Sequence, residues 1–179
     1  MISTIIFDIG QVLIKPDWDK INNAVIKETG VSFFKPKADI DYNSELKRGK
    51  ISEEKYFEVL KKVSNKDLPT KELIKIYEKY YKKFTKINQS LVSLIRNLNK
   101  VYYVVCLSDT NSVNARVNRS RGIFSIFKEC FFSFENGFLK SDYNTFSKIL
   151  KKLNKKPEEC LFIDDYKPNI IGAKAEGLN

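Results

Sequence analysis

The sequence predicts an α/β fold: a doubly wound parallel sheet, or Rossmann-like core, that carries a helical insertion. Short continuous apolar runs indicate buried strands, and segments with helical periodicity lie between them. The stretch between the first two runs is too long for one crossover helix and contains several amphipathic segments. A chain of 179 residues can bury the core of one domain with a small insertion.

Four apolar runs predict the strands of the sheet. They cover residues 2–7, 101–107, 130–134 and 161–163. Such continuous runs are typical of parallel strands that are covered on both faces. Helical periodicity predicts a helix over 87–98 and another over 143–153, and a last helix begins near Pro168, where proline is tolerated. Because strands and helices alternate, the sheet is predicted to be doubly wound.

The long segment of residues 15–85 predicts a small helical bundle over the α/β core, which comprises residues 1–14 and 86–179. Its apolar residues form three stripes at helical spacing. The stripes are Trp18, Ile21 and Val25; Tyr56, Phe57, Leu60 and Val63; and Leu73, Ile76, Tyr77, Tyr80 and Phe84. Gly49 separates two of these segments.

The composition indicates a globular protein without a membrane-spanning segment. Hydrophobic residues make up 42% of the chain and charged residues 30%. The net charge of +10 comes mainly from lysines spread over several predicted helices, which is typical of solvated faces rather than of a nucleic-acid-binding stripe. The first apolar run has no basic residues before it and is interrupted by Asp8, so we interpret it as a strand and not as a signal peptide.

The usage of cysteine and histidine argues against several kinds of site. Cys106, Cys130 and Cys160 are far apart in the sequence, and the chain has no histidine. A zinc site, a disulfide framework and histidine-based catalysis are therefore not expected. Buried free thiols are typical of a reducing compartment, so we expect a cytoplasmic protein.

Carboxylates follow two of the predicted strands. Asp8 ends the first strand, and the pair Asp164-Asp165 ends the fourth. In an open α/β sheet, ligands bind at the carboxyl ends of the strands. Three carboxylates meeting there would repel one another unless a cation lay between them. The sequence therefore predicts a metal-assisted site with an aspartate nucleophile.

The other two strands also end close to polar residues, Ser108 and, a few residues later, Lys140. Taken singly, each of these residues has an ordinary structural explanation. Asp8 could be a turn residue, Asp164-Asp165 could cap a helix, and Ser108 could be a loop hydroxyl. Their joint occurrence at the ends of parallel strands favours a common site.

Four sequence segments resemble, in order, the four motifs of the haloacid dehalogenase superfamily of hydrolases. The segments are FDIGQVLI, LSDTN, SFENGFLKSD and FIDDYKPNIIGAKAEG. The helical insertion lies where this superfamily carries its C1-type cap, and the resemblance covers nearly the whole chain. One such segment is weak evidence, whereas four at successive strand ends are strong evidence. The resemblance implies a phosphatase that acts on a small phosphate ester.

The resemblance also implies a magnesium site. Asp8 would be the nucleophile that forms an aspartyl-phosphate, which water then hydrolyses. Asp8, the backbone carbonyl of Gly10 and Asp165 would hold Mg²⁺ directly, and Asp164 would act through a water molecule. The ion would cancel the repulsion between the attacking carboxylate and the phosphate dianion.

The resemblance to this superfamily also implies a set of substrate-binding residues. Ser108 would donate a hydrogen bond to the phosphoryl group, and Lys140 would supply a fixed positive charge. Backbone groups of Ile9 and Gly10 would add to this cradle, and Asp109 would lie beside the substrate.

The sequence departs from the family pattern at several positions. Relatives usually carry a second aspartate where this chain has Gly10, an asparagine at Asp109, and a proline at Ser141. Relatives also continue beyond Asn179 into a further edge strand, so we expect a sheet with one strand fewer or a shortened chain. The pattern Asp-x-Gly-x-Val defines a subgroup that resembles α-D-glucose-1-phosphatase. Because an anomeric hydroxyl leaves more readily than an ordinary alcohol, the missing acid favours a sugar phosphate as substrate.

Three alternatives stay open on the sequence alone. A 2-haloacid dehalogenase shares the fold and the aspartate nucleophile, but the retained pair Asp164-Asp165 and the absence of an aromatic residue at position 10 argue against it. A non-catalytic member could bind a partner through its tyrosine-rich insertion. A nucleic-acid phosphatase would explain the net charge, yet no basic-aromatic groove is visible. The oligomeric state is not predicted, and no contact with nucleic acid or membrane is expected.

Overall fold

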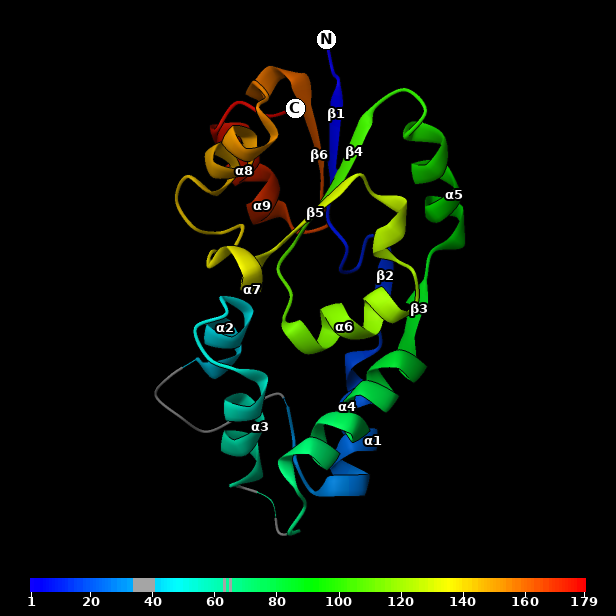
Figure 1. Cartoon of the computed structure of the whole chain (residues 1–179), viewed down its shortest axis with the longest axis vertical. Coiled ribbons are helices and arrows are strands. Elements are labelled where there is room, and N and C mark those ends of the chain that lie inside the picture. The colour runs from blue at the N-terminus through cyan, green and yellow to red at the C-terminus, as the bar shows by residue number, and fades with distance from the viewer. Residues whose placement is uncertain (34–40, 63, 65) are drawn as a thin grey trace.

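The structure of the chain is a computed structural model that describes residues 1–33, 41–62, 64 and 66–179. It has two lobes that follow one another along the longest axis of the molecule (Figure 1). One lobe holds a four-stranded sheet with helices on both faces, and the other holds helices α1 to α4. No helix within the described residues is long and apolar enough to cross a membrane.

The four-stranded sheet is parallel throughout and has the strand order β5-β4-β1-β6. The strands are β1 (Thr4–Phe7), β4 (Tyr103–Ser108), β5 (Glu129–Phe132) and β6 (Cys160–Ile163). The central strands β1 and β4 are the most deeply buried. The prediction of a doubly wound parallel sheet is confirmed.

The residues of β1 alternate between two apolar clusters, one on each face of the sheet. Ile5 and Phe7 pack on the side of α5 (Gln89–Leu98), and Ile6 packs on the side of α8 (Thr145–Leu153) and α9 (Lys167–Ala175). This alternation follows from the two-residue period of a strand. Because both faces of the sheet are covered, successive residues of a strand are all apolar, and the strand appears in the sequence as a continuous apolar run.

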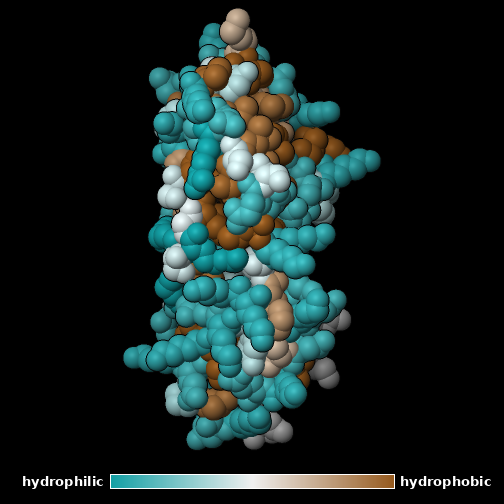
Figure 2. Space-filling model, turned by 90° about the vertical axis from the view of Figure 1, so that its right-hand side faces the viewer, coloured by the Kyte–Doolittle hydropathy of each residue, from teal (hydrophilic) through white to brown (hydrophobic). Residues whose placement is uncertain are grey.

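The α5 face of the sheet is covered less completely than the other face. An apolar groove lies between β1, β6 and α5, and Figure 2 shows apolar side chains gathered on this half of the molecule. The groove is lined by Ile2, Ile5, Phe7, Val12, Leu91, Leu94, Leu98, Tyr102, Leu161 and Ile163.

Two sequence-based expectations about the sheet lobe were wrong in detail. The strand predicted over 130–134 ends at Phe132, and Ser133–Asn136 forms the short helix α7. The chain turns there because the Ser133 hydroxyl exchanges hydrogen bonds of 3.0 and 2.9 Å with the backbone of Thr110, and because Gly137 ends α7 in the left-handed region at φ 79°. The helix predicted over 143–153 begins at Thr145, and Tyr143 precedes it and is 88% exposed.

The insertion begins and ends in a two-stranded antiparallel sheet of β2 (Ile14–Pro16) and β3 (Thr85–Ile87). Between these strands lie α1 (Trp18–Thr29), α2 (Tyr42–Lys47), α3 (Glu53–Lys61) and α4 (Thr70–Phe84). The predicted stripes belong to α1, α3 and α4, except that Val63 lies outside the described residues. The sequence did not predict β2, β3 or α2.

Helix α6 (Ser112–Ser120) follows β4 and joins the sheet lobe to the insertion. Its apolar residues Val113 and Val117 belong to the same buried cluster as the insertion helices. The Tyr77 hydroxyl donates to Asn114 Oδ1 at 2.8 Å, and Asn118 donates to the Tyr81 hydroxyl at 3.0 Å. The insertion is therefore anchored on α6 by apolar contacts and by buried hydrogen bonds.

Candidate active site

Asp8 directly follows β1 at the carboxyl edge of the sheet. Its N–H continues the ladder by donating to the Ile163 carbonyl at 2.8 Å, and the residue is only 6% exposed. The chain then turns, because the Ile9 carbonyl accepts hydrogen bonds from Leu13 and Ile14, each at 2.9 Å. The turn leaves the Asp8 carboxylate at the edge of the sheet where β4, β1 and β6 end together.

Lys140 places a buried ammonium group at the carboxyl edge of the sheet. Its side chain is almost fully buried, and Nζ lies 2.5 Å from Asp8 Oδ1 and 2.6 Å from Asp164 Oδ2. The backbone N–H of Lys140 donates to both carboxylate oxygens of Asp109, at 3.1 and 3.2 Å. Lys140 thus bridges the ends of β1 and β6 from a loop that is itself bonded to the end of β4.

Three carboxylates form a cluster that could hold a metal ion. Asp8, Asp164 and Asp165 each offer one oxygen, and these oxygens lie within 4.8 Å of one another. Asp164 is held in place because it accepts hydrogen bonds from the Tyr166 N–H at 2.7 Å and from the Asn169 amide at 2.9 Å. Asp165 is exposed. Carboxylate oxygens are the donors that Mg²⁺ and Ca²⁺ prefer, so this donor set fits a hard divalent cation.

The electrostatics of the site also favour a cation. Burial raises the pKa of Asp8 to about 6, although the charge and hydrogen bond of Lys140 oppose this shift. Burial likewise raises the pKa of Asp109. For Lys140, burial lowers the pKa, but the attraction of Asp8, Asp164 and Asp109 outweighs it and the net shift is upward. One buried ammonium group therefore faces more negative charge than it can neutralise.

Ser108 ends β4 and is 5% exposed. Its hydroxyl makes no hydrogen bond within the described part of the chain and is thus available to a ligand. Asp109, the next residue, faces the space between the lobes.

The two residues after Asp8 contribute only backbone groups. The Ile9 side chain is 2% exposed and packs in the core, whereas its backbone N–H opposes the rise in the pKa of the Asp8 carboxyl. At Gly10, an added Cβ would meet only Asp8 Oδ2, at 3.8 Å. The site therefore has no acid at position 10, although a Cβ there would have room.

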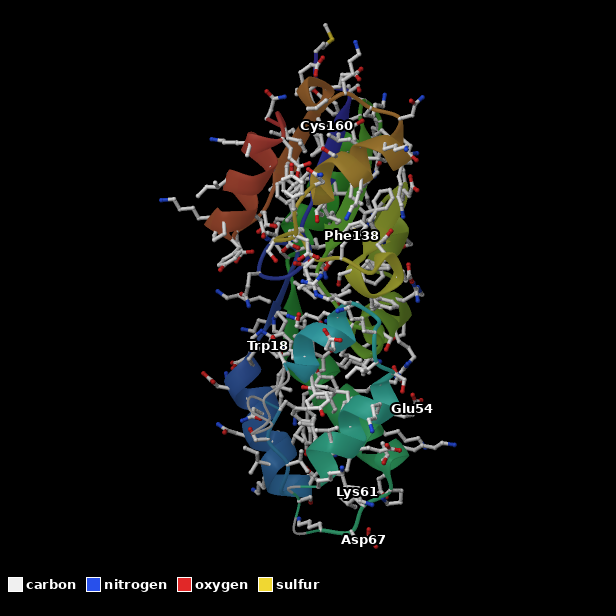
Figure 3. The ribbon with its side chains drawn as sticks, turned by 90° about the vertical axis from the view of Figure 1, so that its left-hand side faces the viewer. Trp18, Glu54, Lys61, Asp67, Phe138 and Cys160 are labelled. Carbon is white, nitrogen blue, oxygen red and sulfur yellow. The ribbon has the colours of Figure 1, made fainter. Side chains whose placement is uncertain are left out.

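A cavity of about 300 Å³ lies between the lobes next to Asp109. It is small but within the usual range for ligand pockets. Figure 3 shows Trp18, one of its lining residues, at the end of α1 that faces the sheet lobe. The lining combines aromatic with polar residues, among them Trp18, Asn22, Asn43, Lys47, Tyr56, Tyr77, Asp109 and Asn111.

The structure brings Asp8, Ser108, Lys140, Asp164 and Asp165 to one edge of the sheet, as expected for strand-end residues. Sequence reasoning missed Asn169, which lies in the first turn of α9 and orients Asp164. A polar residue that is only 7% exposed at a helix start was the available signal, but burial cannot be read from one sequence. The catalytic and ligand-binding roles of these residues remain predictions.

A doubly wound parallel sheet with an acidic cluster and a buried lysine at its carboxyl edge is typical of an α/β enzyme, because ligands bind at that edge. The sequence profile of the haloacid dehalogenase-like hydrolases matches residues 2–177, so the chain belongs to this family of hydrolases. The predicted family and fold are confirmed.

Relatives agree with this assignment. The D-ribitol-5-phosphate phosphatase of Bacteroides thetaiotaomicron is 25% identical over an alignment of 189 residues. The alignment covers 99% of this chain and 90% of the relative. The haloacid dehalogenase (HAD) family enzyme BT-2542 of the same organism, solved with magnesium and inorganic phosphate, matches with a TM-score of 0.87 at 21% identity over 100% of this chain and 92% of that one. A HAD-like hydrolase from Porphyromonas gingivalis matches with a TM-score of 0.77 at 26% identity over 100% of this chain and 89% of that one.

Proposed function

We propose that the protein is a magnesium-dependent phosphatase that hydrolyses a small phosphate monoester through an aspartyl-phosphate on Asp8. The observation that carries this proposal is the cluster of Asp8, Asp164 and Asp165 at the carboxyl edge of the sheet, where the buried Lys140 contacts Asp8 and Asp164. The family and the phosphatase relative support it.

In this proposal Asp8, the Gly10 carbonyl and Asp165 would hold Mg²⁺, with Asp164 acting through water. Bound Mg²⁺ would reduce the repulsion between a carboxylate and a phosphate dianion. The excess of negative charge around Lys140 is the feature of this chain that fits such an ion.

The residues of the chain then have separate tasks. An Asp8 oxygen attacks phosphorus, and the bond from phosphorus to the ester oxygen breaks, with its electron pair leaving on that oxygen. Lys140 and Ser108 stabilise the charge on the transferring phosphoryl group. A water oxygen next attacks the same phosphorus, and the bond from phosphorus to the Asp8 oxygen breaks with its electron pair returning to the carboxylate. One proton of the water ends on the alcohol oxygen and the other on the released phosphate.

The substrate that we favour is the phosphate ester of a polyol or a sugar. The phosphatase relative is named for such a compound. Amides such as Asn43 and Asn111 line the cavity and can bond hydroxyls, while Trp18 and Tyr56 can pack on carbon-bound hydrogens. Most of the lining comes from α1 to α4, so we propose that residues 15–85 form a cap that selects the substrate.

The direct test is hydrolysis of p-nitrophenyl phosphate with Mg²⁺ and with EDTA, followed by a panel of sugar, polyol and nucleotide monophosphates. We expect Mg²⁺-dependent turnover and the highest kcat/KM for a polyol or sugar phosphate. The panel includes 2-chloropropionate without metal, because dehalogenation there with no phosphate release would replace the proposal by the dehalogenase alternative.

Asp165 provides a test of the metal site that does not need activity. Asp165→Ala removes one of the three clustered oxygens, and we expect Mg²⁺ affinity to fall by at least about 10–100-fold, the range found for groups that support metal ligands. Titration calorimetry measures the affinity, and Asp67→Ala is the matched control because the Asp67 side chain is 99% exposed. Equal affinity in the two variants would contradict the metal assignment.

Because Gly10 supplies no acid, we predict that the rate of hydrolysis depends strongly on the acidity of the leaving alcohol. A general acid contributes about 10²–10⁴-fold to the rate, and its absence matters least for esters whose alcohols are acidic. Gly10→Asp should therefore speed simple alkyl phosphates most and aryl phosphates little, because aryl alcohols leave readily without an acid. The Cβ that this change adds has room, since its neighbour Asp8 Oδ2 would lie 3.8 Å away. Single-turnover rates over a series of monoesters measure this dependence, with Gly10→Asn as the control of equal shape. Parallel slopes for the Asp and Asn variants would locate the proton donor elsewhere.

A further inference from the structure

The loop that carries Lys140 is held by two carboxylates, one on each side. Asp109 accepts the backbone N–H of Lys140, and Asp142 accepts the N–H of Leu139 at 3.0 Å. The Leu139 carbonyl in turn accepts from the Asp142 N–H at 3.0 Å and from the Thr145 hydroxyl at 2.7 Å. This compact turn determines where the Lys140 side chain starts.

Asp142 also receives a guanidinium from the insertion. Arg48, the C-cap residue that follows α2, donates from both terminal nitrogens to the two Asp142 oxygens, with Nη2 to Oδ1 at 2.7 Å. The side chains are only 21% and 28% exposed, and this hydrogen bond lowers the pKa of Asp142. A forked, half-buried Arg–carboxylate pair has a defined geometry, unlike most surface ion pairs.

The next residue brings the two backbones into contact. Gly49 has φ +66°, and a Cβ there would lie 2.1 Å from the Phe134 carbonyl oxygen in α7. Only glycine permits this approach. Figure 1 shows α2 directly beside α7. Arg48 and Gly49 therefore dock the end of α2 onto the segment that leads to Lys140.

We propose that Arg48 is a positioning residue for Lys140: its pair with Asp142 couples the seating of α2 on the sheet lobe to the placement of the lysine Nζ between Asp8 and Asp164. The proposal rests on the proposed phosphatase function. In that function the substrate would enter through the cavity between the lobes, so this pair would link the seating of the cap to the group that stabilises the phosphoryl transfer.

The chain provides a matched control in a second arginine that joins the insertion to α6. Arg116 of α6 pairs with Glu53 of α3 at 2.9 Å and with Glu78 of α4 at 2.5 Å. These pairs also join the sheet lobe to the insertion through an arginine fork, but they do not touch the Leu139–Asp142 turn. Arg116→Ala therefore loosens the docking of the insertion without acting on the lysine loop.

The test compares kcat and KM for p-nitrophenyl phosphate with Mg²⁺ in wild type and variants. Arg48→Ala should lower kcat by about 10²-fold, the cost of a small misplacement at a reacting centre, with a much smaller change in KM. Arg48→Lys should recover part of the loss, because it keeps the charge but not the fork. Gly49→Ala should reproduce the loss, and Arg116→Ala should leave kcat near the wild-type value.

A double-mutant cycle identifies the route of the effect. Asp142→Asn keeps an acceptor for the Leu139 N–H but removes the charge that Arg48 binds, so Arg48→Ala combined with Asp142→Asn should lose no more kcat than Arg48→Ala alone. The ¹⁵Nζ chemical shift of Lys140, which needs no turnover, should move in Arg48→Ala and stay constant in Arg116→Ala.

Two results would overturn the positioning role: equal kcat in Arg48→Ala and Arg116→Ala, or losses that multiply in the double variant. Failure of the phosphatase proposal looks different, because then wild type would hydrolyse no ester in the panel. In that case the Lys140 shift alone decides whether Arg48 positions the lysine.

Discussion

Replacement of Asp8 by asparagine is expected to abolish turnover, with a loss of about 10⁴-fold or more, the scale observed when a covalent nucleophile is removed. The amide has the shape of the carboxylate but cannot attack phosphorus. The measurement is kcat with p-nitrophenyl phosphate and Mg²⁺. Asp67→Asn is the matched control, because it makes the same change at an exposed position outside the site.

The loss should not come from unfolding. The pKa of Asp8 is raised from 3.8 to about 6, mainly by burial. Because the pKa of this carboxyl group is higher in the folded than in the unfolded state, the group contributes to the free energy of unfolding at low pH. This contribution is fully present below the unfolded pKa and is lost as the pH rises through the folded pKa. In the metal-free protein above pH ~6, Asp8→Asn should therefore melt at the wild-type temperature or above it. A well-folded variant that kept near-normal kcat would contradict the nucleophile assignment.

Replacement of Lys140 by methionine is expected to have the second largest effect. Nζ is the buried charge that contacts both Asp8 and Asp164, so its removal leaves these carboxylates facing each other. Loss of one donor to a developing oxyanion costs about 10²–10³-fold in kcat. Loss of one partner of a buried ion pair costs about 3–5 kcal/mol in the free energy of unfolding.

Both effects can be measured on the same preparation. Chemical denaturation gives the free energy of unfolding, and added Mg²⁺ should restore more of it in Lys140→Met than in wild type, because the ion supplies the missing positive charge. Lys174→Met, on the exposed surface of α9, is the control. Wild-type kcat in Lys140→Met would show that this lysine is a structural bridge only.

Much of the fold could be predicted because each strand is buried on both faces. Ile5, Ile6 and Phe7 serve two apolar clusters at once, so the strand appears in the sequence as an uninterrupted apolar run. The ends of these runs then indicate the site, since parallel strands finish at the same edge. The positions of the strand ends were therefore sufficient to predict that Asp8, Ser108 and Asp164 lie close together.

Contacts between the lobes could not be predicted in this way. Arg48 and Asp142 are 94 positions apart, and their pairing depends on how the insertion is seated on the sheet lobe. The strands β2 and β3 have three residues each, and α2 has six, which is too short for a period to be recognised. The turn at Ser133 was missed because its hydrogen bonds to Thr110 are tertiary contacts.

The central claim, that Asp8 carries the phosphoryl group during turnover, can be tested by trapping the intermediate. Wild-type protein is mixed with Mg²⁺ and a substrate from the panel, quenched in acid within the first turnover, digested, and analysed by mass spectrometry. We predict one added phosphoryl group on the peptide that contains Asp8, lost on treatment with hydroxylamine and absent in Asp8→Asn. Phosphate release by wild type at full rate, with the Asp8 peptide unmodified at every quench time, would contradict the account.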